Sequence, residues 1–224
     1  MHARLLRRHQ LKATFYMIYE LAHFLKDKCS LLWDVAEWCN ATLFSLLYGR
    51  KLTSIAAIIT GVPPQFTLRL AQKNDLPSLD AFFKRQPSEA FRYFKPHKFD
   101  EQTLKRLLTN KSFIILLLTE HTGLTDEIVG YAFMRSFVNG SSYRGYMVDA
   151  GHRGQGLAKI MGYGMNTVGD KLILEMYKSI SPKNVASMKA TQTVCRTKLL
   201  RTLDNGDYLL KCTSRPHCQD NCSD

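Results

Sequence analysis

The pattern of apolar and polar residues divides the chain into two parts. In residues 1–62, apolar residues recur at helical spacing, first within Leu11–Leu25 and then over Leu31–Tyr48. We expect two amphipathic helices, the second ending at Gly49. Charged residues interrupt both runs, whereas a membrane-spanning helix needs roughly 20 continuous apolar residues. The sequence therefore predicts a helical N-terminal extension over residues 1–62.

After Pro63-Pro64, short strand patterns alternate with helical ones, and Asn139-Gly140 predicts a hairpin. The order of elements predicts an α/β fold with a mixed sheet over residues 63–213, followed by a polar tail over residues 214–224. The expected elements are a strand at Phe66–Leu70, helices at Asp75–Arg85 and Glu101–Leu108, strands at Ser112–Thr119, Glu127–Phe137 and Tyr143–Asp149, a helix to about Val168, a strand at Lys171–Ile180, a helix from Asn184 and a strand at Tyr208–Cys212.

The net charge of +12 and the sequence pI of about 9.5 indicate either a solvated basic surface or a polyanionic partner. Composition alone does not choose between nucleic acid, anionic lipid and a phosphorylated cofactor. The chain contains no helix-turn-helix, zinc-finger or RNA-binding motif, so we expect no nucleic-acid partner.

Cysteine usage and the N-terminal residues predict a cytoplasmic protein. The basic stretch Met1–Gln10 is followed by an apolar run that charged residues break, so it does not fit a secretory signal. The six cysteines are then expected to be free thiols. Cys212, His217, Cys218 and Cys222 do not have the spacing of a strong zinc motif, and we expect no metal site.

The most informative segment lies between the expected strand ending at Asp149 and the following helix. It reads Arg153-Gly154-Gln155-Gly156-Leu157-Ala158. Glycines let the backbone turn sharply and approach a ligand closely. The first N–H groups of a helix have no internal partner and lie at its positive end, so they suit phosphate oxygens. The spacing fits neither a Walker loop nor a dinucleotide-binding motif.

This segment resembles the acetyl-CoA signature of the GNAT superfamily, Gln/Arg-x-x-Gly-x-Gly/Ala. Asn184 to Ser187 is similar to the family's Asn-x-x-Ala/Ser element, and Asn205 to Leu210 is similar to its closing turn and strand. The resemblance covers roughly Phe66 to Cys212. It implies a GNAT-like mixed, mostly antiparallel central sheet flanked by helices, with acetyl-CoA as co-substrate and no metal.

The resemblance also implies the cofactor-binding residues. Backbone N–H groups from Gly154 to Ala158 would hold the pyrophosphate, and Met147 and Val148 would pair with the pantetheine arm. The N–H of Val148 would polarise the thioester carbonyl. The implied set is Met147, Val148, Arg153, Gly154, Gln155, Gly156, Leu157, Ala158 and Asn184.

The catalytic base and acid are less defined. We consider Asp149, His152 and His97 as bases, although Asp149 also fits a loop cap, His152 a loop surface and His97 an aromatic core. Family members often carry a tyrosine acid on the helix after the Asn element. Thr191 occupies that position here, so the acid stays unassigned.

The resemblance implies acetyl transfer from acetyl-CoA to a primary amine of a small molecule, by direct attack in a ternary complex. The stretch Tyr93–Phe99 is similar to one in some bacterial amino-sugar N-acetyltransferases, which indicates a nucleotide-linked amino sugar as acceptor. The alternatives are a protein or peptide N-acetyltransferase and a non-catalytic CoA-binding sensor or scaffold. Residues 1–62 are expected to form a helical cap or a dimerisation element packed on the main domain, and peripheral membrane contact is the alternative.

Overall fold

The computed structural model describes residues 30–55, 62–123 and 126–215. The chain divides into two compact units, Met1–Thr42 and Leu43–Asp224, and the sheet belongs to the second. The helix expected within Leu11–Leu25 lies outside the described residues, as do residues 216–224 of the expected tail. The predicted domain boundary after residue 62 stays a prediction.

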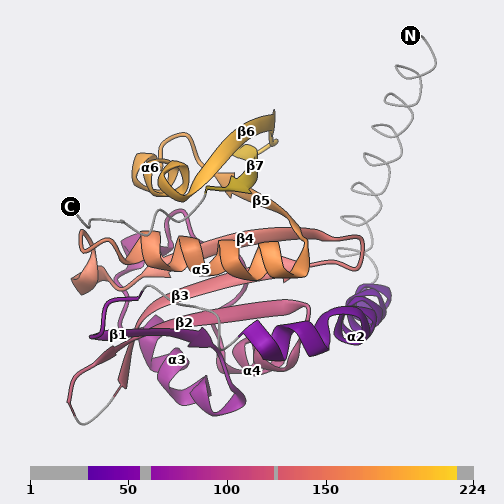
Figure 1. Cartoon of the computed structure of the whole chain (residues 1–224), viewed down its shortest axis with the longest axis horizontal. Coiled ribbons are helices and arrows are strands. Elements are labelled where there is room, and N and C mark those ends of the chain that lie inside the picture. Colours follow the sequence, from indigo (N-terminus) through magenta and orange to yellow (C-terminus); the bar gives the residue numbers. More distant parts are fainter. Residues whose placement is uncertain (1–29, 56–61, 124–125, 216–224) are drawn as a thin grey trace, which may run out of the picture. The chain divides into compact units, whose positions relative to one another are not determined.

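A single seven-stranded sheet with the order β1-β2-β3-β4-β5-β7-β6 organises the second unit (Figure 1). Every neighbouring pair is antiparallel except β4 and β5, which run parallel. The strands are β1 (Phe66–Leu70), β2 (Phe113–His121), β3 (Asp126–Ser136), β4 (Ser141–Val148), β5 (Glu175–Ile180), β6 (Cys195–Thr202) and β7 (Tyr208–Ser214).

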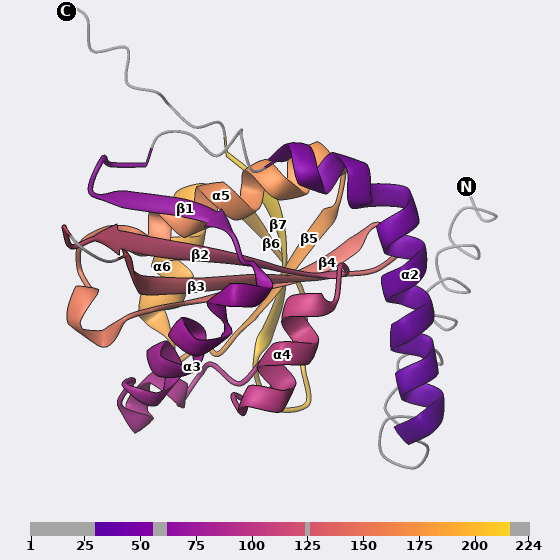
Figure 2. The same cartoon turned by 90° about the horizontal axis from the view of Figure 1, so that it is seen from below.

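Helices cover both faces of this sheet. Figure 2 shows α5 on one face and α3 with α4 on the other. The mixed, mostly antiparallel sheet flanked by helices confirms the predicted fold class. The helices are α2 (Ser30–Ile55), α3 (Leu76–Lys84), α4 (Glu101–Thr109), α5 (Leu157–Leu172) and α6 (Val185–Val194), with short 3₁₀ turns η1 (Lys73–Asp75), η2 (Ser88–Phe91) and η3 (Ala150–His152).

The strand β2 is apolar from Phe113 to Leu118 because this part of it is buried on both faces. Its even-numbered residues Ile114, Leu116 and Leu118 belong to the hydrophobic cluster under α5, and Ile115 and Leu117 belong to the cluster under α3 and α4. Side chains alternate between the two faces of a strand, so a strand covered on both sides needs no polar positions.

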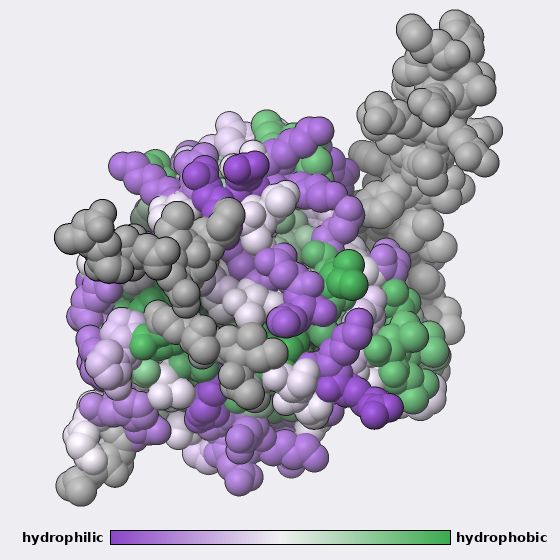
Figure 3. Space-filling view, in the orientation of Figure 1, coloured by the Kyte–Doolittle hydropathy of each residue, from purple (hydrophilic) through white to green (hydrophobic). Residues whose placement is uncertain are grey.

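The surface has the opposite character. The face shown in Figure 3 is mostly hydrophilic, with hydrophobic side chains in separate small groups. Exposed apolar residues of α2 in the second unit include Leu43, Leu46 and Leu47. Isolated apolar side chains are normal on protein surfaces, whereas three on neighbouring turns of one helix suggest a contact surface.

In the C-terminal half of the sheet, one expected strand has a different start and one strand was not expected. The strand expected at Lys171–Ile180 begins only at Glu175, because α5 continues to Leu172, which is buried. The strand β6 was missed altogether. It is an edge strand with mostly exposed and partly basic residues, so it lacks the apolar alternation that marks a strand.

The helix α2 also extends beyond its expected end. It passes through Gly49 and continues to Ile55, which is almost fully buried in the core together with Phe44. Burial of a large apolar side chain contributes about 1.5–3 kcal/mol, more than the roughly 1 kcal/mol cost of a glycine inside a helix. Packing therefore carries the helix past Gly49.

Ile173, which follows α5, carries local backbone strain that predicts a stabilising substitution. Its φ is 57°, and its side chain is 79% exposed, so little burial would be lost on replacement. A left-handed conformation costs a non-glycine residue about 1–2 kcal/mol. Ile173→Gly should raise the free energy of unfolding by about 1 kcal/mol after the entropy cost of glycine is subtracted. Urea unfolding measures this change.

The matched control is Val185→Gly, which alters an exposed β-branched residue at the start of α6. Val185 does not have a positive φ, so this change should lower stability. A loss of stability in Ile173→Gly similar to that in the control would contradict the strain at residue 173.

Candidate functional site

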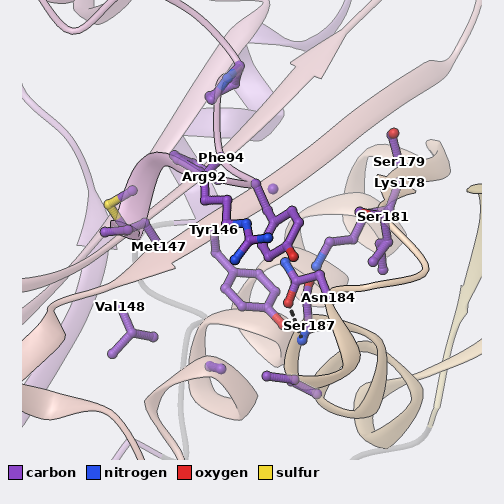
Figure 4. A pocket seen from close by; sticks show the side chains of 18 of the residues that line it. Arg92, Phe94, Tyr146, Met147, Val148, Lys178, Ser179, Ser181, Asn184 and Ser187 are labelled. Atoms are coloured by element: carbon purple, nitrogen blue, oxygen red, sulfur yellow. Dashed lines mark hydrogen bonds between the residues drawn. The ribbon is translucent and has the colours of Figure 1, made fainter. Parts of the chain in front are cut away.

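The strands β4 and β5 part after only three paired positions. Ser141 to Tyr143 pair with Glu175 to Tyr177, after which β4 continues to Val148 and β5 to Ile180. A cleft of about 980 Å³ opens between the separated ends and extends over the loop before α5 and the start of α6. Figure 4 shows the side chains of some of the residues that line it.

One edge of this cleft is formed by unpaired backbone groups of β4. The N–H of Asp149 donates to Val129 of β3, whereas Gly140 accepts from Glu175 at the start of β5. Successive residues of a strand direct their backbone groups to opposite edges. The N–H and C=O groups of Tyr146 and Val148 therefore face the cleft, as an additional extended chain would require.

The second feature is the turn that leads from β4 into α5. Gly154 and Gly156 have φ values of 83° and 78°, which glycine adopts without strain. A Cβ at either position would meet no atom within 4 Å, so the backbone borders open space. Gly156 has no side chain to cap α5, and the first N–H groups of the helix are available to an anion.

The helices behind the cleft are fixed to both sides of the opening. Arg144 of β4 donates to the Asn166 side chain of α5 over 2.5 Å, and Asn166 donates to the Val194 carbonyl at the end of α6 over 2.9 Å. A Cβ at Gly162 would lie 2.8 Å from Val194 Cγ2, so glycine there permits the close approach of α5 and α6. These contacts connect β4 to α6 across the point where the sheet opens.

Asp149 acts as the anchor of the loop. Its carboxylate accepts hydrogen bonds from Arg85 Nε at 2.8 Å, Gln86 Nε2 at 2.7 Å and the Gly151 N–H at 2.9 Å. Partial burial alone would raise its pKa, but the bonds from Gln86, Arg85 and His152 hold the pKa of Asp149 well below its usual range. Such a carboxylate accepts a proton poorly at neutral pH, so the geometry favours a structural role over that of a base.

His152 connects the same loop to β2. Its Nδ1 lies 3.1 Å from Asp149 Oδ1 and its Nε2 lies 3.1 Å from Glu120 Oε2. Burial lowers the pKa of His152, but the hydrogen bonds with Asp149 and Glu120 outweigh this and raise it. His152 borders the cleft, although both ring nitrogens are occupied. The base role of His152 stays a prediction.

His97 packs among the aromatic rings of the cluster under α3 and α4 and is not among the residues that line the cleft. Its Nε2 is 2.8 Å from the Tyr131 hydroxyl and its Nδ1 is 2.7 Å from the Lys98 carbonyl. Rings of Phe83, Phe99 and others surround it, and burial lowers its pKa. Both nitrogens are engaged away from the cleft, which favours the core interpretation of His97.

Tyr146 and Lys178 line the cleft, and the sequence patterns did not single out either. The Lys178 ammonium lies 3.9 Å from the Tyr146 ring centroid and donates to Thr191 Oγ1 over 2.9 Å. Burial, together with the nearby Arg144, lowers the pKa of Lys178 to about 7. Figure 4 shows Tyr146, Lys178 and Ser187 directed toward one another. The position of Tyr146, two residues before Val148 on the same strand, was the signal available in the sequence.

The cleft is predominantly cationic. Its described lining contains five lysine or arginine residues and two carboxylates, Glu89 and Asp207. Arg92 and Lys95 lie on the segment after η2, where Tyr93 is also exposed. This charge suits a polyanionic ligand. The cations are Arg92, Lys95, Arg144, Arg153 and Lys178.

The structure brings most of the expected cofactor-binding residues to this one cleft. Gln155 is exposed and is not among the lining residues, and Met147 directs its buried side chain into the core under α3 and α4. Asn184 lines the cleft and caps α6 by accepting from the Ser187 N–H. The residues that line the cleft are Met147, Val148, Arg153, Gly154, Gly156, Leu157, Ala158 and Asn184. Their roles stay predictions.

Over the described part of the chain, no group of three or more His, Cys, Asp or Glu side chains is arranged to hold a metal ion. Within the same residues, no helix is both long enough and apolar enough to cross a membrane.

Comparison with known proteins identifies the fold. By sequence, no family model and no curated protein matches the chain. By structure, it is similar to the GNAT domain of S. lividans PAT, with a TM-score of 0.55, 15% identity and coverage of 64% of this chain and 88% of that one. The chain therefore has the fold of GNAT acetyltransferases.

Two further solved structures share this fold. Ribosomal-protein-S5-alanine acetyltransferase from Vibrio fischeri has a TM-score of 0.55 and 14% identity, with 70% of this chain and 97% of that chain covered. AAC(6′)-Ib in complex with paromomycin and acetyl-CoA has a TM-score of 0.50 and 18% identity, with 71% and 99% covered.

The bridge made by His152 predicts a pH-dependent stability. Because its pKa is raised in the folded protein, its contribution is fully present below the unfolded value of about 6.5 and is lost as the pH rises through the folded value. His152→Gln should lower the free energy of unfolding by about 1 kcal/mol at pH 5.5 and by less at pH 8.5. Urea unfolding of both proteins at the two pH values measures this. A penalty that grew with pH would contradict the bridge.

Proposed function

We propose that this protein transfers an acetyl group from acetyl-CoA to a primary amine by direct attack in a ternary complex. The observation that carries the proposal is the parting of β4 and β5 beside an uncapped helix N-terminus. The free edge of β4 offers alternating N–H and C=O groups to an extended amide-containing arm, and α5 offers N–H groups to phosphate. Acetyl-CoA supplies the activated acyl group when bound.

The residues of the cleft fit this co-substrate. The N–H groups that begin α5, together with Arg153, would hold the pyrophosphate, and Gly154 and Gly156 leave space beside it. The backbone of Tyr146 and Val148 would bind the arm and polarise the acyl carbonyl. The backbone groups of Met147 pair with β3, so Met147 would support the site only through the packing of its side chain in the core.

We further propose a small anionic amine as acceptor, such as a nucleotide-linked amino sugar. Arg92 and Lys95 border the cleft, with the exposed ring of Tyr93 between them. Cationic side chains attract phosphate, and an exposed aromatic ring stacks on sugars and bases. Among proteins of this fold, AAC(6′)-Ib binds a small molecule together with acetyl-CoA, and this supports a small-molecule acceptor.

Acetylation of a protein or peptide is the second candidate. The fold neighbour from Vibrio fischeri is a ribosomal-protein acetyltransferase, which supports this class equally. The excess of cations in the cleft opposes basic peptides as acceptors. A CoA-binding sensor or scaffold without catalysis is the third candidate, and binding without acetyl transfer to any amine would favour it.

The N-terminal helix is proposed to contact a membrane surface or a second copy of the chain. Exposed Leu43, Leu46 and Leu47 of α2 support this proposal. The described cysteines Cys39, Cys195 and Cys212 are free thiols, which supports the proposed cytoplasmic location.

The cofactor proposal predicts a selective loss of acetyl-CoA binding. Isothermal titration should give micromolar binding to the parent protein. Gly154→Glu should weaken binding at least about 100-fold, because it places a carboxylate beside the phosphate site and strains a backbone with a φ of 83°.

Gly140→Glu provides the matched control, because Gly140 has the same φ of 83° but lies in the β3–β4 hairpin. This control carries equal strain and equal charge and should bind acetyl-CoA as the parent does. Absence of binding to the folded parent, or equal weakening in both variants, would contradict the assignment of the loop.

A further inference from the structure

The Tyr146 hydroxyl is a buried polar group in the cleft. It makes no well-formed hydrogen bond with any residue that the structure describes, although the side chains of Ser187 and Thr191 lie beside it. Leaving a buried hydroxyl without a partner costs about 1–3 kcal/mol, so such groups usually have a ligand or a reaction to serve. Tyr146 is on the strand whose free edge faces the cleft.

The position of Tyr146 along this edge places it near the reacting end of the proposed co-substrate. An arm that begins at the N-terminus of α5 runs along β4 from Val148 toward Tyr143, where β4 and β5 come together. The side chains of Tyr146 and Lys178 lie on the face of the sheet that α5 and α6 cover. They border the cleft there, between Val148 and the position where β4 and β5 begin to pair. The sulfur atom would then lie beside the phenol.

We propose that Tyr146 is a catalytic residue that donates its phenolic proton to the sulfur of the departing CoA. This inference rests on the proposed function and adds to it the acid that the helix α6 lacks, since Thr191 stands where the family resemblance implies a tyrosine. The tyrosine that reaches the site comes instead from β4.

The proton and electron balance of the step is complete without a further reactant. As the amine nitrogen forms a bond to the acyl carbon, the carbon–sulfur bond breaks and its electron pair goes to sulfur. Tyr146 transfers its O–H proton to sulfur, which yields the CoA thiol and a phenolate. The proton released by the attacking amine restores the phenol through water in the open cleft.

The surroundings of Tyr146 help its phenolate form. Burial raises the pKa of Tyr146, and the neighbouring side chains of Thr191 and Ser187 together with the charge of Arg144 oppose that effect. The Lys178 ammonium lies 3.9 Å from the ring centroid and, when it is charged, attracts the electron-rich ring. Lys178 is held in place by its hydrogen bond to Thr191, which in turn donates to the Ser187 carbonyl over 2.7 Å. Lys178 is therefore a positioning residue for the phenol.

A binding cycle tests the contact between phenol and sulfur without an acceptor. CoA and desulfo-CoA, in which hydrogen replaces the thiol, are titrated calorimetrically into the parent protein and Tyr146→Phe at pH 8.5, where part of the thiol is ionised. The parent should bind CoA about tenfold more tightly than desulfo-CoA, since a hydrogen bond to a charged sulfur is lost. In Tyr146→Phe this preference should fall to about one, with binding of desulfo-CoA unchanged.

Tyr177→Phe is the control, because the Tyr177 hydroxyl bonds to Glu175 at 2.6 Å and does not line the cleft. It should keep the tenfold preference. Equal binding of CoA and desulfo-CoA by the parent alone would overturn the role of Tyr146, even if Tyr146→Phe did not fold, while leaving the proposed function intact. Failure of the parent to bind either ligand would overturn the proposed function itself.

Discussion

The short pairing between β4 and β5 is the constraint on which the site depends. Three paired positions hold the strands together at one end, and their divergence exposes backbone groups that a continuous sheet would satisfy internally. An open sheet interior has an energetic cost, so it needs support from the helices behind it. Arg144, Asn166 and Gly162 give this support by connecting β4, α5 and α6.

The loop before α5 depends on a second set of contacts. Asp149 and His152 lie in the sequence where a catalytic base would be expected, yet their hydrogen bonds tie the loop to Arg85, Gln86 and Glu120. These bonds hold the glycine-rich turn in place before any ligand binds. A site that is ordered beforehand loses less conformational entropy on binding, which is the physical advantage of such a structure.

Much of the fold and part of the site could be predicted from the sequence. Gly154 and Gly156 could be predicted because a left-handed backbone favours glycine, and the apolar run of β2 could be predicted because a strand buried on two faces is apolar. The hydrogen bond between Arg85 and Asp149 could not be predicted, because the two residues lie 64 positions apart along the chain. Likewise, the edge strand β6 has no buried face that a pattern of apolar residues would mark. For Tyr146, the only signal in the sequence was its position two residues before Val148, which places both on the same side of β4.

The central claim is that the free edge of β4 binds the arm of acetyl-CoA. Residue-resolved amide hydrogen exchange with and without acetyl-CoA tests it most directly. The claim predicts that the N–H groups of Tyr146 and Val148, together with those that begin α5, become protected, while Met147, already paired with β3, changes little. Unchanged exchange at Tyr146 and Val148 in the presence of saturating acetyl-CoA would contradict it.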